Sequence, residues 1–426
     1  MKILSITAQK PHSTGSGTYM TELVRAFART GHSQAVVCGI FPDDIVDFPE
    51  GVGCYPVFFS ETADKSDLLA APCKAANCSS VQAKFNSLPF PVVGMSDIMP
   101  YTSTRYRDLT PEMISQFEAA FIDAAERAVS DLDPDIIICH HLFLLTALVK
   151  KHFPERTIVG ISHGTDLRQM INCDNLREIV RPYIRELDAA LALHSEQRKT
   201  IIDVFGMDED RVSVIGSGYN AGLFNTEGRK SRKKDEPLRF TYAGKISRPK
   251  GVPEMLAALE KLSDDSDVPA FSLTMAGGCQ DEVLKDRMGS LPAYVSWLGQ
   301  IPQPALADLM RQTDIFILPS YFEGLPLVLI EAMSAGAVPV STDLPGIQSW
   351  INANVGGPNA VFVPMPQMKS IDEPTDAGRE AFVNDLYRTL KDVTAAFVEG
   401  ALPGPLPDTS SITWDGLAAR LLSISL

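Results

Sequence analysis

The sequence contains no apolar run that approaches the ~18 residues a transmembrane helix requires, so it predicts no membrane span. Cations are also scarce, because 38 Lys and Arg face 53 Asp and Glu, for a net charge of −15. Nucleic-acid-binding domains carry a basic footprint, so this deficit argues against a nucleic-acid partner. The acidic balance favours solubility, and peripheral contact with a membrane surface stays open.

The spacing of a disulfide framework is absent as well. Seven cysteines, an odd number, are scattered along the chain, which indicates a reducing, cytoplasmic setting. Cys73 and Cys78 are a candidate pair, but free thiols fit the pattern better. The stretch Met1–Ala8 is too short for a signal-peptide core and is typical of a first strand.

What the sequence does contain is a strand, a loop and a helix around residues 314–335. An apolar run bounded by Asp314 and Pro319 predicts a short buried strand. Pro326 suits the first position of the following helix, because its missing N–H would be unpaired there anyway. The free amides of Leu327 and Val328 at such a helix start attract anions, phosphate above all.

Two carboxylates accompany this helix start, Glu323 in the loop and Glu331 about one turn into the helix. Both carboxylates are negatively charged, so they would repel a phosphate that lay directly beside them. The arrangement makes sense if each carboxylate instead accepts hydrogen bonds from hydroxyls of the same ligand, as a sugar and a ribose would offer. The predicted ligand is therefore a sugar–diphosphate–nucleoside.

The motif Pro-Ser-x-x-Glu-Gly-x-Pro-x4-Glu-Ala-Met, residues 319–333, resembles the Glu-x7-Glu signature of the retaining GT-B glycosyltransferases, glycosyl transferases group 1. The resemblance covers nearly the whole chain except about residues 41–110. It implies an α/β fold of two Rossmann-like domains that face each other across a cleft. It also implies that Glu323 holds the transferred sugar, that Glu331 holds the ribose, and that Gly324 and Leu325 complete the substrate-binding loop.

The first strand–helix–strand unit carries a short glycine loop. Strand-like Lys2–Thr7 is followed by Gly15-Ser-Gly17 and then by helical spacing from Tyr19. A dinucleotide fingerprint would need a third glycine near Met20, so the sequence disfavours an NAD site. The resemblance places this loop beside the donor's phosphates and sugar, where Gly17 permits close approach.

Residues 41–110 have no clear periodicity, and we interpret them as an irregular insertion. Two interpretations stay open. The segment is either a cap packed on the domain surface or part of an acceptor pocket, to which Tyr101, Arg105, Tyr106 and Arg107 would offer stacking and charge.

Histidines end two predicted strands of the first half. By resemblance, His163 faces the donor sugar and Asp166 orients that imidazole or the loop; the alternative is a buried, hydrogen-bonded His163. The pair His140-His141 suits a structural or lining role better than a metal site, because adjacent strand residues point to opposite faces. The Asp131-Leu-Asp133 segment simply precedes a strand, so we reject it as a metal motif.

Cations follow the first strand of the second half, at Lys245 and Lys250. Their physical use would be to neutralise charge on a departing diphosphate, which otherwise needs a metal. The family commonly shows Arg and then Lys at this spacing, so Lys245 stands where a bidentate Arg is usual, and Arg248 could compensate. The alternative is that both are exposed helix-start cations.

Two further segments of the second half complete these assignments. By resemblance, the nucleobase contacts the main chain of the loop at Gly299 and Gln300. The cation run Arg229–Lys234 reads as a solvated linker.

The resemblance implies three parts of the chain. An N-terminal acceptor-side domain spans residues 1–218, a nucleotide-sugar-binding domain spans 219–405, and a C-terminal helix within 406–426 crosses back to the first domain. The length of 426 residues suits two or three domains.

By resemblance, the expected activity is retaining, metal-independent transfer of a sugar from a nucleoside-diphosphate sugar, with a UDP-sugar favoured and no cofactor. The acceptor is an unidentified hydroxyl on a small molecule, glycan, lipid or protein. The resemblance implies that the acceptor attacks on the leaving-group face while a phosphate oxygen takes its proton. Alternatives are a nucleotide-sugar epimerase of the same fold and a non-catalytic nucleotide-sugar-binding subunit.

Overall fold

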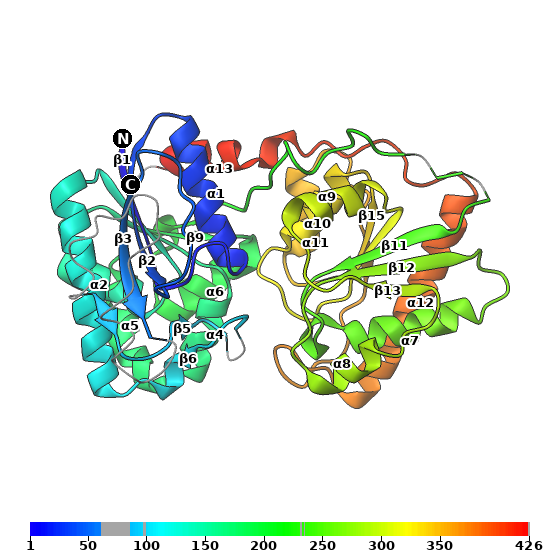
Figure 1. Cartoon of the computed structure of the whole chain (residues 1–426), viewed down its shortest axis with the longest axis horizontal. Coiled ribbons are helices and arrows are strands. Elements are labelled where there is room, and N and C mark those ends of the chain that lie inside the picture. The colour runs from blue at the N-terminus through cyan, green and yellow to red at the C-terminus, as the bar shows by residue number, and fades with distance from the viewer. Residues whose placement is uncertain (61–85, 97–98, 231, 234, 425–426) are drawn as a thin grey trace. The chain divides into compact units, whose positions relative to one another are not determined.

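The computed structural model describes residues 1–60, 86–96, 99–230, 232–233 and 235–424. The candidate cysteine pair at Cys73 and Cys78 lies outside these residues. The chain divides into two compact units (Figure 1). Unit 1 comprises Met1–Ser217 and Trp414–Leu426, and unit 2 comprises Gly218–Thr413.

Unit 1 is built on an eight-stranded parallel sheet in the order β10-β9-β8-β7-β1-β2-β3-β4. The strands of unit 1 are β1 (Lys2–Thr7), β2 (Ser33–Ile40), β3 (Gly53–Phe59), β4 (Ser87–Leu88), β7 (Ile136–His140), β8 (Ile158–Ile161), β9 (Ala189–Ala192) and β10 (Val212–Val214), with β5 (Val93–Gly94) and β6 (Thr104–Arg105) as a separate pair. The helices of unit 1 are α1 (Gly15–Arg29), α2 (Pro111–Leu132), α3 (Leu144–His152), α4 (Thr165–Asn172), α5 (Asp174–Arg185), α6 (Ser195–Phe205) and α13 (Trp414–Leu422), with short 3-10 turns η2 (Tyr106–Asp108) and η3 (Glu209–Arg211).

Helices cover both faces of this sheet. Alternate residues of β2 point to opposite sides, so Val36 packs in one apolar cluster with Met20 of α1, whereas Val37 packs in another with Phe121 of α2. Parallel strands that are buried on both faces consist of continuous apolar runs. Such runs can be recognised in the sequence, which is why most of these strands could be predicted.

The prediction of an irregular insertion over residues 41–110 is wrong for Gly53–Phe59, which form β3 and pair with β2. Pro56 lies inside this strand opposite Cys38, and a proline in an apolar run argues against a strand when only the sequence is seen. Tyr106, which was a candidate for an acceptor pocket, is a core residue, only 2% exposed, and its ring lies 4.8 Å from that of Phe143.

Unit 2 is built on a second parallel sheet, whose six strands lie in the order β13-β12-β11-β14-β15-β16. The strands of unit 2 are β11 (Leu238–Ala243), β12 (Phe271–Ala276), β13 (Val295–Trp297), β14 (Ile315–Leu318), β15 (Val338–Thr342) and β16 (Val361–Val363). The helices of unit 2 are α7 (Val252–Ser263), α8 (Glu282–Met288), α9 (Gln303–Arg311), α10 (Leu327–Ser334), α11 (Ile347–Asn354) and α12 (Asp376–Val398), with η4 (Arg248–Lys250) and η5 (Ser410–Ile412).

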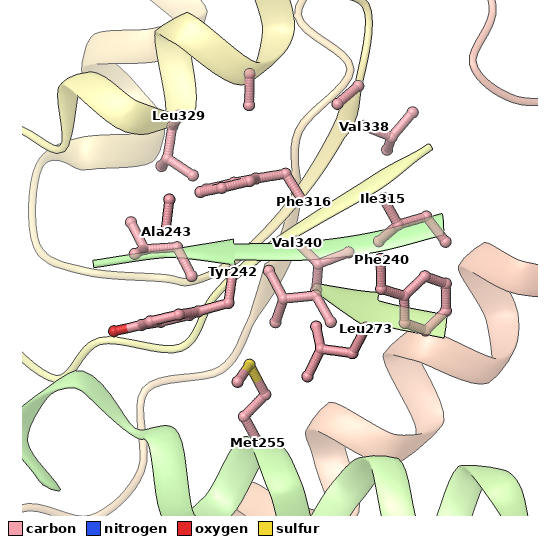
Figure 2. Close-up of a cluster of buried hydrophobic side chains, with 14 of the residues drawn as sticks. Phe240, Tyr242, Ala243, Met255, Leu273, Ile315, Phe316, Leu329, Val338 and Val340 are labelled. Atoms are coloured by element: carbon pink, nitrogen blue, oxygen red, sulfur yellow. The ribbon is translucent and has the colours of Figure 1, made fainter. Parts of the chain in front are cut away.

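The core of unit 2 lies on both sides of this sheet (Figure 2). Phe316 of β14 lies on the side of Leu329 from α10, and Tyr242 of β11 lies on the side of Met255 from α7 (Figure 2). All four are buried. The α/β class and the two Rossmann-like units are therefore confirmed.

Arg229 corrects the interpretation of its cation run as a solvated linker. Its guanidinium donates to the carbonyls of Ala335 at 2.9 Å, Thr313 at 2.9 Å and Arg311 at 3.2 Å. These carbonyls lie at the C-terminal ends of α9 and α10, where a cation is favoured. Arg229 therefore caps two helices.

The last helix, α13, belongs to unit 1. The ring of Trp414 lies 5.2 Å from that of Tyr19 on α1, and Arg29 forms an ion pair with Asp415 at 2.6 Å. The C-terminal segment predicted to cross back to the first domain was residues 406–426. In the structure only the part from Trp414 belongs to unit 1, because residues 406–413 belong to unit 2.

Among the helices of the described residues, none combines the length and the apolar character that crossing a membrane needs.

Candidate active site

In unit 2 the strand order reverses between β11 and β14. Ligands of doubly wound sheets bind outside the carboxyl ends of the strands at such a point. The loops that leave β11 and β14 there are joined, because the amide of Tyr321 donates to the carbonyl of Pro249 at 3.0 Å. The predicted cations and Glu323 lie on these two loops, and Glu331 lies in the helix that follows the second loop.

Gly251 holds the two loops in contact. It has a left-handed φ of +64°, and a Cβ at this position would lie 2.1 Å from the carbonyl oxygen of Pro319. Only glycine fits both the backbone angle and the space. The residue before it, Lys250, is thereby fixed beside the end of β14.

Lys250 and Glu323 form an ion pair with 2.6 Å between Nζ and Oε1. The sequence had given them separate tasks, on phosphate and on sugar. Burial and, after it, the charge of Lys250 lower the pKa of Lys245. The ammonium groups of Lys245 and Lys250 therefore lie close enough to repel each other. Arg248, expected to compensate for a missing Arg, instead pairs with Asp281 at the start of α8, at 3.5 Å.

The helix after this loop begins one residue later than predicted. Pro326 is the N-cap of α10, and Leu327 and Val328 are its first two residues. Glu323, Gly324, Leu325 and these two residues are all half-buried. The loop therefore presents its main chain and the helix start together with Lys250.

Glu331 lies in α10 and keeps some exposed surface. Protein atoms surround its carboxyl group, and this burial raises the pKa of Glu331 to about 8. The group is therefore mostly protonated at neutral pH. Hydroxyls that donate to the carboxylate would favour its ionised form.

This shift predicts a pH dependence of stability. The folded-state pKa of Glu331, about 8, lies above its ordinary value of 4.5, so its contribution is complete below the ordinary pKa and is lost as pH rises through about 8. Glu331→Gln should therefore gain stability relative to the wild type between about pH 5 and about pH 9, measured by urea unfolding. Glu260→Gln, at an exposed position of α7, is the control; an equal trend in both variants would contradict the assignment.

Glycines also hold the loops after β11, β12 and β13 together. A Cβ on Gly277 would lie 1.8 Å from the carbonyl oxygen of Gly244, and the amide of Gly277 donates to the carbonyl of Gly299 at 2.7 Å. Gly299 has a left-handed φ of +68° and Gln300 is exposed. The predicted nucleobase loop thus lies at the same edge of the sheet as Lys245.

In unit 1 the strand order reverses between β1 and β7, and the glycine loop follows β1. A Cβ on Gly17 would lie 2.6 Å from the carbonyl oxygen of Lys10, whereas nothing lies within 4 Å of one on Gly15. The amide of Gly17 donates to Thr14, the N-cap of α1, at 3.2 Å. The loop's own backbone therefore requires glycine at position 17, apart from any ligand.

Three histidines meet after β7 and β8. Nδ1 of His140 lies 3.2 Å from Nε2 of His163, and the ring of His141 lies 4.8 Å from that of His163. The expectation that His140 and His141 point to opposite faces is wrong, because β7 ends at His140 and His141 has a left-handed φ of 74°. His163 was expected to face the donor sugar, and His140 and His141 were expected to have a structural or lining role, but their contact with His163 was not predicted.

Burial keeps these imidazoles neutral. It lowers the pKa of His140 and His163 well below the ordinary value and that of His141 to about 3. Among the residues that the structure describes, no group of three or more His, Cys, Asp or Glu is arranged to hold a metal ion.

The side chain of Asp166 is completely buried. Its carboxylate accepts from the amide of Leu142 at 2.7 Å, the hydroxyl of Ser162 at 2.9 Å and the amide of Leu167 at 3.1 Å. Of its two predicted tasks, orienting the imidazole of His163 or orienting the loop, these hydrogen bonds support the second.

Comparison with known proteins covers both units. The model of the family "Glycosyl transferase 4-like domain" matches residues 14–218, and that of "Glycosyl transferases group 1" matches residues 224–375. A glycogen synthase of Mycobacterium tuberculosis is 29% identical over 263 residues, which cover 58% of this chain and 63% of that protein. A phosphatidyl-myo-inositol mannosyltransferase of Mycolicibacterium smegmatis is 27% identical over 192 residues, 45% of this chain and 48% of that protein.

These sequence matches span less than two thirds of either relative's length. Among solved structures, sucrose-phosphate synthase of Thermosynechococcus elongatus superposes with a TM-score of 0.62 at 17% identity, covering 99% of this chain and 97% of that one. Each half of the chain therefore matches a glycosyl transferase family model, and over its whole length the chain has the GT-B fold.

Proposed function

We propose that this protein transfers a sugar from a nucleoside-diphosphate sugar, with a UDP-sugar favoured, to an acceptor hydroxyl with retention of anomeric configuration. The observation that supports this most is the grouping in unit 2 of Lys245, Lys250 and the start of α10 at the reversal of strand order. Positive charge and amide dipoles at one point suit a diphosphate leaving group.

Each group has a chemical task in this proposal. Lys245, Lys250 and the amides of Leu327 and Val328 stabilise the diphosphate as its bond to the sugar breaks. Glu331 accepts from the ribose hydroxyls. Glu323 accepts from hydroxyls of the transferred sugar, and its ion pair with Lys250 at 2.6 Å holds the carboxylate in place for that purpose.

We assign no side chain of the described residues as the base that receives the acceptor's proton. The three histidines are neutral but largely buried, and burial disfavours their protonated forms. We infer that the acceptor attacks on the face of the leaving group and that a phosphate oxygen takes the proton. His163 then steadies the sugar without acting as a base.

The acceptor and the cellular setting complete the proposal. The two curated relatives are named for different products, a glucan and a mannosylated lipid, so the acceptor class is left to experiment. We propose a cytoplasmic enzyme that works without a metal ion or a cofactor.

The test starts from donor binding. The protein is screened by thermal shift with UDP, GDP and ADP and with their sugars, because a ligand of the native state raises the melting temperature. UDP and one UDP-sugar should give the largest shifts. If GDP or ADP does so instead, the base preference is wrong.

Turnover then separates the classes. A glycosyltransferase releases nucleotide slowly with the donor alone and much faster once a suitable acceptor is added, and NMR of the product reports the anomeric configuration. Rapid release of nucleotide with an epimerised sugar and no acceptor favours the epimerase. Tight binding with no turnover across donors and acceptors favours a non-catalytic subunit.

A further inference from the structure

The contact between His140 and His163 restricts which atom of His163 can meet a ligand. The two ring nitrogens are 3.2 Å apart, the ring centroids are 5.4 Å apart and the ring planes differ by 12°. The rings therefore meet edge to edge through Nδ1 of His140 and Nε2 of His163. Because Nε2 is occupied inside the protein, only Nδ1 of His163 is left for a ligand.

The hydrogen bond also fixes a proton count. A neutral imidazole carries one N–H and one bare nitrogen, and burial disfavours the charged form of both rings. One ring must therefore donate and the other accept. Either His140 donates and His163 carries its proton on Nδ1, or His163 donates and His140 carries its proton on Nε2.

The environment of His140 favours the first arrangement. Its Nε2 is buried and has no hydrogen-bond partner among the residues that the structure describes. A proton on that atom would be a buried N–H without an acceptor, the rarer and less tolerated of the two orphan states. A proton on Nδ1 instead makes the hydrogen bond to His163.

The surroundings hold the pair in this geometry. The ring of Tyr19 meets that of His163 at 4.9 Å and that of His140 at 6.1 Å, both nearly perpendicular. The position of Tyr19 is itself fixed, because its hydroxyl donates to the carbonyl of Gly216 at 3.2 Å and its ring packs on Trp414 of α13. The C-terminal helix thus supports the histidine pair through Tyr19.

We propose that His140 is a positioning residue, which donates from Nδ1 to Nε2 of His163 and so presents Nδ1–H of His163 to the substrate as a hydrogen-bond donor. A donor there would polarise a sugar oxygen and could not accept the acceptor's proton. This consequence rests on the proposed glycosyl transfer, whereas the tautomer itself does not.

The direct test is the tautomer in the wild-type protein. Two-bond 1H–15N correlation spectra of the 15N-histidine-labelled full chain report which nitrogen carries the proton, and His163→Gln identifies the His163 signals by their loss. We expect the Nδ1–H pattern for His163. The Nε2–H pattern, or an averaged one, would overturn the proposal even if the protein is an active transferase.

Kinetics of matched variants supply the second test. His140→Asn keeps a donor close to the place of Nδ1, whereas His140→Leu has a similar size and no donor. By analogy with residues that orient a histidine ligand, Leu should lower kcat by about 10–100-fold with little change in the donor KM, and Asn should restore most of it. His152→Leu, at a partly exposed histidine of α3, controls for the loss of a histidine.

Two results of these kinetics would contradict the proposal, and the spectrum covers the case in which a variant does not fold. Equal kcat in the Asn and Leu variants would contradict positioning by a donor. A loss in both with normal melting temperatures would do the same. If His140→Leu does not fold, the wild-type spectrum alone still confirms or refutes the tautomer.

Discussion

Lys250→Ala should lower kcat by about 10²–10³-fold, the usual cost of removing one group that stabilises developing negative charge. In the proposed reaction Lys250 offsets charge on the departing diphosphate, and its Nζ already lies in the loop before α7 beside the end of β14. Donor binding should weaken less than turnover, because the leaving group's charge grows towards the transition state. Steady-state kinetics with the identified UDP-sugar measure both effects.

The ion pair with Glu323 offers a second explanation, which a double variant separates. If Lys250 serves only to neutralise Glu323 at 2.6 Å, then the double variant Lys250→Ala with Glu323→Gln should be no slower than Glu323→Gln alone, because no unpaired carboxylate remains. If Lys250 acts on the diphosphate, the double variant should be much slower than Glu323→Gln alone. Lys285→Ala, at an exposed lysine of α8, should leave kcat unchanged.

Gly251→Ala should both destabilise unit 2 and reduce turnover. The Cβ would stand 2.1 Å from the oxygen of Pro319, so the loop of Lys250 has to move away from the end of β14. A left-handed alanine costs about 1–2 kcal/mol and overpacking adds about 1–3 kcal/mol. We expect a loss of about 2–5 kcal/mol in urea unfolding and a fall in kcat beyond what that loss explains.

A second glycine provides the matched control. Gly228 has a φ of +75° but nothing within 4 Å of its Cβ position. Gly228→Ala should therefore show only the backbone cost, about 1–2 kcal/mol, with normal kcat. Equal effects of the two substitutions would show that the contact with Pro319 has no importance for the site.

The local parts of the fold were visible in the sequence. Asp314 and Pro319 bound β14 as expected, and Thr110 with Pro111 starts α2, with the Thr110 hydroxyl accepting from the amide of Met113 at 3.2 Å. Such signals lie within a few residues of the feature that they mark. Strand β3 was missed because Pro56 hides it.

The parts of the site that depend on tertiary contacts could not be read in this way. Lys250 and Glu323 are 73 residues apart and meet only because β11 and β14 are neighbours. The histidine pair joins residues of β7 and the loop after β8, and the contact of Tyr19 with Trp414 joins opposite ends of the chain. Spacing along the sequence carries no signal for such pairs.

The central claim is that unit 2 holds a diphosphate between two ammonium groups and the start of α10, with carboxylates on the neutral hydroxyls. A crystal structure of the protein with a bound UDP-sugar tests it most directly. We expect phosphate oxygens within hydrogen-bond distance of Lys250 Nζ and of the amides of Leu327 and Val328, with the ribose hydroxyls at Glu331. A diphosphate lodged away from residues 323–331 would contradict the account.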